Sequence, residues 1–314
     1  MTNGPLILVL GVTASGKGSL AFELAQTFGG EIISIDSMKV YRRMDIGTAK
    51  PTPEKRRRIP YHLIDVVEPS EAFSVDRFLD LANEAIDGIL DRGKSVIAVG
   101  GTALYIKTLL YGLFDGPGEN PIIRERLRKQ FLDEGGTVLH QRLRSVDAEA
   151  AARIHPNDQR RIVRALEVLE LTGKPISSFQ EQFGSGRMLR DWTILGLRRE
   201  KSAESRRINM RVKRMIDQGL VEEVRSLLRE EKPLSRQARA AIGYAEMIDH
   251  LQGRIPLDDA VEKIKVNTRK LAKAQRTWFK TFRQVQWLDI GDEESVESVL
   301  NRAMPILSAD QSNS

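Results

Sequence analysis

Cysteine is absent from this chain of 314 residues, and histidine occurs only four times. Without cysteine the chain can form no disulfides and offers no thiolate ligands to a metal ion. The histidines are also too widely spaced for the H-E-x-x-H pattern that holds zinc on a helix. Any bound metal ion should therefore be a hard cation such as Mg²⁺, held by oxygen ligands and by substrate phosphate.

Long hydrophobic runs are missing as well. No stretch approaches the ~20 apolar residues that a membrane-spanning helix requires, and the first residues, MTNGPLILVLG, lack the basic start and small-residue cleavage site of a secretory signal. These absences favour a cytoplasmic protein without a membrane partner. The length leaves room for one α/β domain with an insertion or a second lobe.

A glycine-rich loop follows the first apolar segment. Residues 6–19 read LILVLGVTASGKGS, in which Gly11, Gly16 and Lys17 match the phosphate-binding (P-loop) pattern G-x-x-x-x-G-K-[ST]. The glycines let backbone N–H groups converge on phosphate oxygens, the next helix contributes its positive N-terminus, and the lysine adds a mobile charge. The loop therefore predicts a site for a diphosphate or polyphosphate. Its predicted residues are Gly11, Thr13, Ala14, Ser15, Gly16, Lys17 and Gly18.

The last position of this pattern is different. Gly18 stands where a serine or threonine hydroxyl normally binds Mg²⁺, and Ser19 follows one residue later. We therefore expect Mg²⁺ to be held mainly by substrate phosphate oxygens and water, with Ser19 or a carboxylate as any direct protein ligand.

Positive charge is in excess, with 49 lysines and arginines against 43 aspartates and glutamates, a formal net charge of +6. The basic residues gather in clusters, which lie at 56–58, 124–129, 160–164, 206–214 and 263–283. One such cluster is usually a solvated helix face, but several of them beside a phosphate loop favour nucleic acid as a partner.

Strand and helix patterns alternate along much of the chain. Strands are predicted at 31–35, 95–99 and 193–197, and an amphipathic helix over 75–91 with Ser74 as its N-cap. This alternation is typical of an α/β fold with a parallel, doubly wound sheet of the P-loop NTPase type, whose ligands bind beyond the carboxyl ends of the strands.

Polar residues follow several of these strands. Asp36 and Ser37 come after one strand, and Thr102 lies in the glycine turn after another. Because these strand ends share one edge of the sheet with the phosphate loop, we expect all of them to meet in one site.

The alternation stops in the middle of the chain, where charged helices follow one another without strands. We predict a P-loop α/β core formed by residues 1–116 and 190–314, and a helical insertion domain over 117–189 that contacts the substrate.

Several strings, in this order, resemble those of one enzyme family, the bacterial tRNA dimethylallyltransferases or IPP transferases. They are GVTASGKG, IDSMKVYRRMDIGTAKP, VGGTALYIKTLLYGL, HPNDQRRIVRALEVLELTGKPIS, AIGYAEM and NTRKLAKAQRTWFK, and they extend from about residue 6 to residue 279. The resemblance implies transfer of a dimethylallyl group from dimethylallyl diphosphate to N6 of the adenosine 3′-adjacent to the anticodon of tRNA. Pyrophosphate would be released.

The resemblance also implies roles for individual residues. Lys17 would stabilise the diphosphate, and Asp36 would be the base that accepts the proton of the adenine amine. Asp36 could instead cap the following turn or bind Mg²⁺. Thr102 would contact the same adenine or cap a helix. Arg211 matches an arginine that reaches the diphosphate, with Arg207 as a second candidate; the alternative for Arg211 is a solvated basic residue.

Recognition of RNA would require the target adenosine to turn out of the anticodon loop, because a stacked base cannot present its amine to a buried site. The predicted tRNA-binding residues are Asp36, Ser37, Met38, Lys39, Thr102, Arg124, Arg160, Arg161 and Arg164. Ion pairs with Glu167 or Glu170 are the alternative for the arginines. We interpret Trp278 and Phe279 as packing residues, because Leu271, Gln275 and Trp278 are spaced like a buried stripe.

Other functions are also compatible with these residues. A P-loop kinase of a nucleoside or small metabolite shares the loop and the sheet, and an isopentenyltransferase of free adenine nucleotides shares the chemistry. An RNA-binding protein without catalysis is suggested by Gly18. We expect the chain to act as a monomer.

Overall fold

The computed structural model describes residues 4–113, 116–179 and 187–311. It divides into two compact units, one formed by Met1–Leu110 and Arg190–Ser314 and the other by Tyr111–Leu189. The predicted boundary at residue 117 lies in the connection that follows α4 (Ala103–Tyr111). Each unit has its own core and is described separately below.

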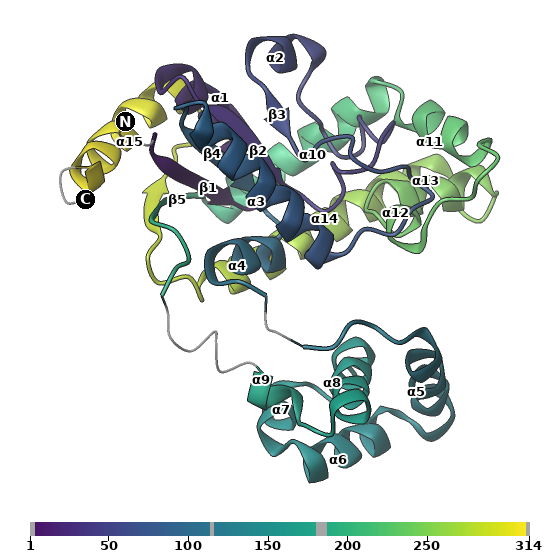
Figure 1. Cartoon of the computed structure of the whole chain (residues 1–314). Coiled ribbons are helices and arrows are strands. Elements are labelled where there is room, and N and C mark those ends of the chain that lie inside the picture. Colours follow the sequence, from purple (N-terminus) through teal and green to yellow (C-terminus); the bar gives the residue numbers. More distant parts are fainter. Residues whose placement is uncertain (1–3, 114–115, 180–186, 312–314) are drawn as a thin grey trace. The chain divides into compact units, whose positions relative to one another are not determined.

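The first unit contains a six-stranded sheet, in the order β3-β2-β4-β1-β5-β6, in which all neighbouring strands are parallel (Figure 1). Residues of β2 and β4 are all buried, as expected for strands of a parallel sheet that is covered on both faces. The strands are β1 (Leu6–Gly11), β2 (Glu31–Ile35), β3 (Tyr61–His62), β4 (Val96–Gly100), β5 (Trp192–Arg198) and β6 (Gln286–Asp289).

Two helices far apart in sequence pack together against this sheet. α1 (Lys17–Thr27) contributes Leu20 and Leu24, and α15 (Val296–Gln311) contributes Val299, to one core that also includes strand residues such as Ile7. α3 (Val75–Asp91) contacts β2 and β4, and the Ser74 hydroxyl accepts a hydrogen bond from Arg77 N at 3.1 Å at its start.

A group of helices follows β5 and packs beside the sheet (Figure 1). They are α10 (Lys201–Asp217), α11 (Leu220–Leu228), α12 (Arg236–Arg239), α13 (Tyr244–Leu251) and α14 (Leu257–Phe279), and the short helix α2 (Pro53–Arg58) also belongs to this unit. The longest of the group, α14, runs back to contact β1 and also packs on α10 and α13.

The second unit is helical over its described residues. Its core is formed by buried apolar residues such as Leu127, Leu143, Ile162 and Leu166. Its helices are α5 (Pro121–Glu134), α6 (Gly136–Val146), α7 (Ala148–Arg153), α8 (Gln159–Thr172) and α9 (Ile176–Phe179).

The predicted fold class, an α/β fold with a parallel sheet and a helical insertion, is confirmed. The predicted strand at 31–35 and helix at 75–91 have the observed bounds, and β4 lies one residue later than predicted. The short edge strands β3 and β6 and the helix α15 were not predicted. Among the described helices, none combines the length and apolar character needed to cross a membrane.

Candidate active site

The loop between β1 and α1 has the geometry of a phosphate cradle. Ala14 and Gly16 have left-handed backbone angles, with φ of 63° and 101°. Gly11 has no room for a side chain, because a Cβ atom there would lie 2.7 Å from Ser15 Oγ and 3.1 Å from Leu197 O. Ser15 N donates to Val12 O at 3.2 Å, which closes the turn. The loop is therefore held in one tight conformation.

Arginines from the end of β5 and from α10 contact this loop. Arg199 Nε donates to Ser15 O at 2.9 Å, and Arg207 Nε donates to Ala14 O at 2.9 Å. Arg211 Nη1 lies 3.2 Å from Thr13 Oγ1. Carbonyl oxygens repel phosphate, so binding them to guanidinium groups leaves the loop better suited to an anion. Arg199, just beyond the end of β5, was not predicted; it is one of several arginines at 198–214 and carried no distinguishing signal.

A glutamine from α14 completes the support of the loop. Gln275 Oε1 accepts a hydrogen bond from Thr13 N at 2.9 Å, and Gln275 Nε2 donates to Gly101 O at 2.9 Å. Its side chain is 8% exposed. The sequence predicted Gln275 as part of a buried stripe, but Leu271 of that stripe is 41% exposed. The contacts of Gln275 with Thr13 and Gly101 were not predicted.

Asp36 lies directly after β2 and has one carboxylate oxygen in use. Oδ1 accepts hydrogen bonds from Met38 N at 2.9 Å and Lys39 N at 3.2 Å. The carboxylate therefore caps the following turn, as the alternative interpretation expected. Oδ2 makes no hydrogen bond with the described residues, so it is available to a ligand.

Thr102 lies beside Asp36, in the turn between β4 and α4. Its hydroxyl oxygen accepts a hydrogen bond from Ser37 N at 3.1 Å, across the ends of β4 and β2. The hydroxyl hydrogen is therefore free to donate to a ligand. The structure thus places Asp36 and Thr102 together at the strand ends, as predicted.

Cations surround this carboxylate. Burial, together with the neighbouring charges of Lys39 and Arg211, lowers the pKa of the Lys17 ammonium to about 7. Burial also lowers the pKa values of Lys39 and Arg211, and Asp36 opposes the shift in each of these groups. Several cations near one carboxylate give the site an excess of positive charge, which a diphosphate would neutralise.

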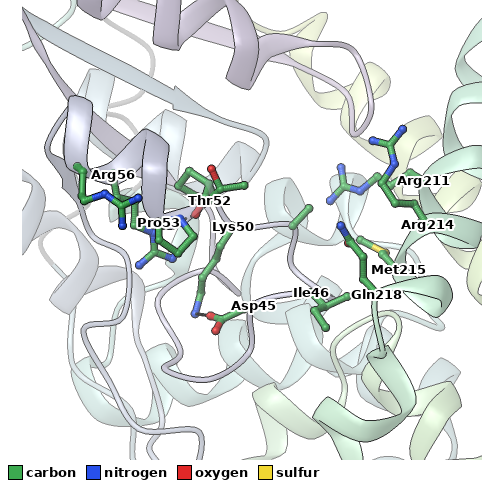
Figure 2. A pocket seen from close by; sticks show the side chains of 13 residues that line it. Asp45, Ile46, Lys50, Thr52, Pro53, Arg56, Arg211, Arg214, Met215 and Gln218 are labelled. Atoms are coloured by element: carbon green, nitrogen blue, oxygen red, sulfur yellow. Dashed lines mark hydrogen bonds and ion pairs between the residues drawn. The ribbon is translucent and has the colours of Figure 1, made fainter.

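A cavity of about 830 Å³ is lined by the segment around α2 and by the C-terminal half of α10 (Figure 2). Arg211 is common to the cavity wall and the phosphate loop, because it lines the cavity and also contacts Thr13. Lys50 at its base is bound to Asp45 at 2.7 Å and to Asp65 at 2.5 Å. The cationic residues of its wall are Lys50, Arg56, Arg57, Arg211 and Arg214, and its acidic residue is Asp45.

Ligands for Mg²⁺ are few at this site. Ser19 is exposed, and its hydroxyl makes no hydrogen bond with the described residues. A Cβ atom on Gly18 would have no neighbour within 4 Å. Within residues 4–113, 116–179 and 187–311, no three His, Asp or Glu side chains gather as a metal-binding group. Such a donor set fits only an ion that takes most of its ligands from phosphate and water.

In the second unit, two of the predicted RNA-binding arginines are engaged by a buried carboxylate. Glu167 is fully buried and accepts hydrogen bonds from Arg164 Nη1 at 2.7 Å, Arg124 Nε at 3.0 Å and Asn120 N at 2.7 Å. Burial raises the pKa of Glu167, but these hydrogen bonds outweigh burial and hold it below its ordinary value. The ion-pair alternative therefore holds for these two arginines in the unbound chain.

The other two predicted arginines of this unit are exposed. Arg160 makes no hydrogen bond or ion pair with the described residues, and Arg161 forms an exposed pair with Asp158 at 3.3 Å. Glu170 pairs with Arg126 and Arg142 instead of the predicted arginines. Arg160 and Arg161 are therefore available to an anionic partner.

The sequence model of IPP transferases matches residues 39–282. The chain belongs to the IPP transferase family. It is 49% identical over 299 residues to a tRNA dimethylallyltransferase of Geobacter metallireducens, which covers 95% of this chain and 96% of the relative. The family inferred from the sequence strings is therefore confirmed.

Solved structures agree with this membership. A full-length tRNA isopentenylpyrophosphate transferase of Bacillus halodurans matches with a TM-score of 0.70 and 37% identity, over 98% of each chain. A eukaryotic dimethylallyltransferase acting on tRNA matches with a TM-score of 0.84 and 30% identity, over 99% of this chain and 80% of its own.

Proposed function

We propose that this chain transfers a dimethylallyl group from dimethylallyl diphosphate to N6 of the adenosine 3′-adjacent to the anticodon of tRNA. One observation carries the proposal: the free oxygen of Asp36 and the hydroxyl of Thr102 lie at the same strand ends as a cation-rich phosphate cradle. The chain is a prenyltransferase of tRNA, as its family and the names of its relatives indicate. The residue roles that follow are our proposal.

The cradle would bind the diphosphate of the donor. As the bond between the allylic carbon and the diphosphate oxygen breaks, negative charge grows on the leaving group, and positive groups already in place stabilise it. Lys17 and Arg211 supply these groups. A bound diphosphate raises the lowered pKa of Lys17, so the lysine is charged in the complex.

Asp36 would act on the acceptor. As N6 of the adenine forms its bond to the allylic carbon, the nitrogen becomes positive and must lose a proton, which Asp36 Oδ2 accepts. Thr102 would donate its hydroxyl hydrogen to the same base and fix its orientation. The balanced outcome is one new bond between N6 and carbon, one broken bond between carbon and oxygen, a protonated Asp36 and free pyrophosphate.

Mg²⁺ would be bound mainly by diphosphate oxygens and water, with Ser19 or Asp36 as the protein ligand. Its chemistry would be neutralisation of phosphate charge. No three His, Asp or Glu side chains gather as a metal-binding group within the described residues, which supports this arrangement over a cage built by the protein.

The RNA would be held by basic side chains and by a pocket for the flipped adenosine. Lys39, next to Asp36, and the exposed Arg160 and Arg161 are the residues best placed to bind it. Ser37 and Met38 contribute through the backbone of the Asp36 turn. The guanidinium groups of Arg124 and Arg164 are paired with Glu167, so these arginines would bind tRNA only by contacting Glu167 and the RNA at the same time. We propose that the chain acts as a monomer in the cytoplasm.

The test is an acceptor competition. The purified chain is incubated with labelled dimethylallyl diphosphate, Mg²⁺ and either unmodified tRNA, AMP or ATP. We expect label only in tRNA, at the adenosine 3′-adjacent to the anticodon after nuclease digestion. Label in AMP or ATP would instead identify a free-nucleotide isopentenyltransferase, and phosphate transfer from ATP without prenylation would identify a kinase.

A further inference from the structure

Gln275 joins two parts of the first unit that are distant in sequence. Its side-chain oxygen binds Thr13, 262 residues away, and its side-chain nitrogen binds Gly101, 174 residues away. Both hydrogen bonds are 2.9 Å long, and Gln275 is buried, as are Ala272 and Phe279 of the same helix. In such an apolar environment a hydrogen bond is stronger than in water, and its loss leaves unpaired polar groups.

The first partner belongs to the donor side of the site. Thr13 N is bound to Gln275, so this N–H group is not one that binds phosphate. The hydroxyl of the same residue contacts Arg211. Gln275 therefore sets the position of the loop segment against which Arg211 rests.

The second partner belongs to the acceptor side. Gly101 precedes Thr102, whose hydroxyl holds Ser37 next to Asp36. Gly101 N also donates to Ile35 O at 3.3 Å, so the turn is fixed by β2 on one side and by Gln275 on the other. The fit is close: a Cβ atom on Gly101 would lie 2.5 Å from Gln275 Nε2.

We propose that Gln275 is a positioning residue that sets the separation between the phosphate cradle and the adenine-binding turn. This proposal rests on the proposed function. An in-line transfer needs the allylic carbon and N6 in a fixed near-attack geometry, and a shift of ~1 Å can cost about 10²-fold in rate. The amide acts through Thr13 and Gly101, and it touches neither substrate.

Three variants test the proposal. Gln275→Met keeps the length of the side chain and removes both hydrogen bonds, whereas Gln275→Glu keeps the acceptor for Thr13 and, when ionised, loses the donor to Gly101. Gln252→Met is the matched control, because Gln252 is exposed and its side chain makes no hydrogen bond with the described residues. Single-turnover prenylation is measured per active site, with dissociation constants for dimethylallyl diphosphate and tRNA measured separately.

We expect Gln275→Met to slow the chemical step about 10- to 100-fold, with both dissociation constants changed less than about threefold. The control should match the wild type. A protonated glutamic acid can donate to Gly101 O and accept from Thr13 N, as the amide does. The rate of Gln275→Glu relative to Gln275→Met should therefore rise as the pH falls. The ionisable groups around the cradle, Lys17, Lys39 and Asp36, are present in both variants, so taking the ratio removes effects that the two variants share.

A purely structural role would lower the melting temperature and the fraction of active sites but leave the rate per active site unchanged. That result would overturn the proposal. So would a loss confined to substrate affinity, or a ratio of the Gln275→Glu rate to the Gln275→Met rate that does not change with pH. Failure of the proposed function is distinguishable, because it would show as an absence of tRNA prenylation in the wild type.

Discussion

Two carboxylates, one in each unit, show how differently this chain treats its cations. Glu167 is fully buried in the second unit, and Arg124, Arg164 and Asn120 N bind both of its oxygens. Asp36 is half-buried in the first unit, and only its Oδ1 is bound. Glu167 forms ion pairs with the arginines around it. Around Asp36, by contrast, the three cations Lys17, Lys39 and Arg211 have one carboxylate charge between them, so the site has an excess of positive charge.

A basic cluster therefore predicts a ligand only where carboxylates of the folded protein do not neutralise its positive charge. Removing one partner of a buried ion pair mainly lowers the stability of the protein. Removing a cation that no carboxylate neutralises should instead lower substrate affinity or the reaction rate.

The largest effect is expected for Asp36→Asn. The amide oxygen can still accept from Met38 N and Lys39 N, but the side chain cannot take the proton of the adenine amine. We expect a loss of about 10²- to 10⁴-fold in the single-turnover rate with both substrates bound. Glu167→Gln is the matched control and should lower stability without slowing chemistry. A Mg²⁺ titration separates the roles of Asp36, since rescue by excess metal would make it a metal ligand rather than the base.

Lys17→Ala should remove charge stabilisation from the leaving diphosphate. We expect the barrier of the chemical step to rise by roughly 2–4 kcal/mol, the usual cost of losing an anion-stabilising donor. Single-turnover prenylation at saturating substrates measures this loss of rate. Lys213→Ala, which removes an exposed lysine of α10, is the control. An unchanged rate would remove Lys17 from the catalytic set.

The lowered pKa of Lys17 also predicts a pH dependence of donor binding. The lysine is charged below about pH 7 and becomes neutral above it, while the diphosphate binds the charged form better. The affinity for dimethylallyl diphosphate should therefore fall as the pH rises through 7, by up to about tenfold per pH unit. Calorimetric titration over this range checks the slope. Lys17→Ala should lose this component, and a slope that persists in the variant would assign it to another group.

The arginines of the second unit should separate into two groups. Arg160→Gln should weaken tRNA binding and reduce its salt dependence by about one unit of slope, with little change in stability. Arg164→Gln should instead destabilise the protein by roughly 1–3 kcal/mol, because it removes a hydrogen bond from buried Glu167. Filter binding at several salt concentrations and thermal unfolding measure the two effects. Arg144→Gln, exposed on α6, is the control, and equal behaviour of Arg160 and Arg164 would refute the distinction.

Gly18→Ser should have the smallest effect. A side chain at this position meets no neighbour within 4 Å, and the residue lies in the first turn of α1, so the protein should fold normally. The rate should stay within about threefold of the wild type, with half-saturation at a lower Mg²⁺ concentration because a hydroxyl ligand is added. A large loss of activity at all Mg²⁺ concentrations would show that the open space beside Gly18 is needed for the substrate.

The sequence predicted the parts of the site that depend on local pattern. The phosphate loop follows from its glycines and lysine, and the meeting of Asp36 with Thr102 follows from the rule that parallel strands end at one edge. The short strand β3 and the edge strand β6 carry too few residues for a period to be recognised. Their pairing is decided by neighbours in the sheet.

Contacts across long sequence separations were beyond such patterns. Gln275 reads as an ordinary helical residue, and its role depends on hydrogen bonds to Thr13 and Gly101 in other elements. The predicted tRNA-binding arginines looked equivalent in sequence. Only the structure separates Arg164, bound to Glu167, from Arg160, which is exposed.

The most direct test of the account follows both products of one turnover. In rapid-quench experiments with labelled dimethylallyl diphosphate and tRNA, pyrophosphate and N6-dimethylallyladenosine should form with the same rate constant in the wild type. In Asp36→Asn both should slow together, because cradle and carboxylate act on one pair of substrates. Release of pyrophosphate at the wild-type rate without formation of the modified adenosine would contradict a single site built from Lys17, Asp36 and Thr102.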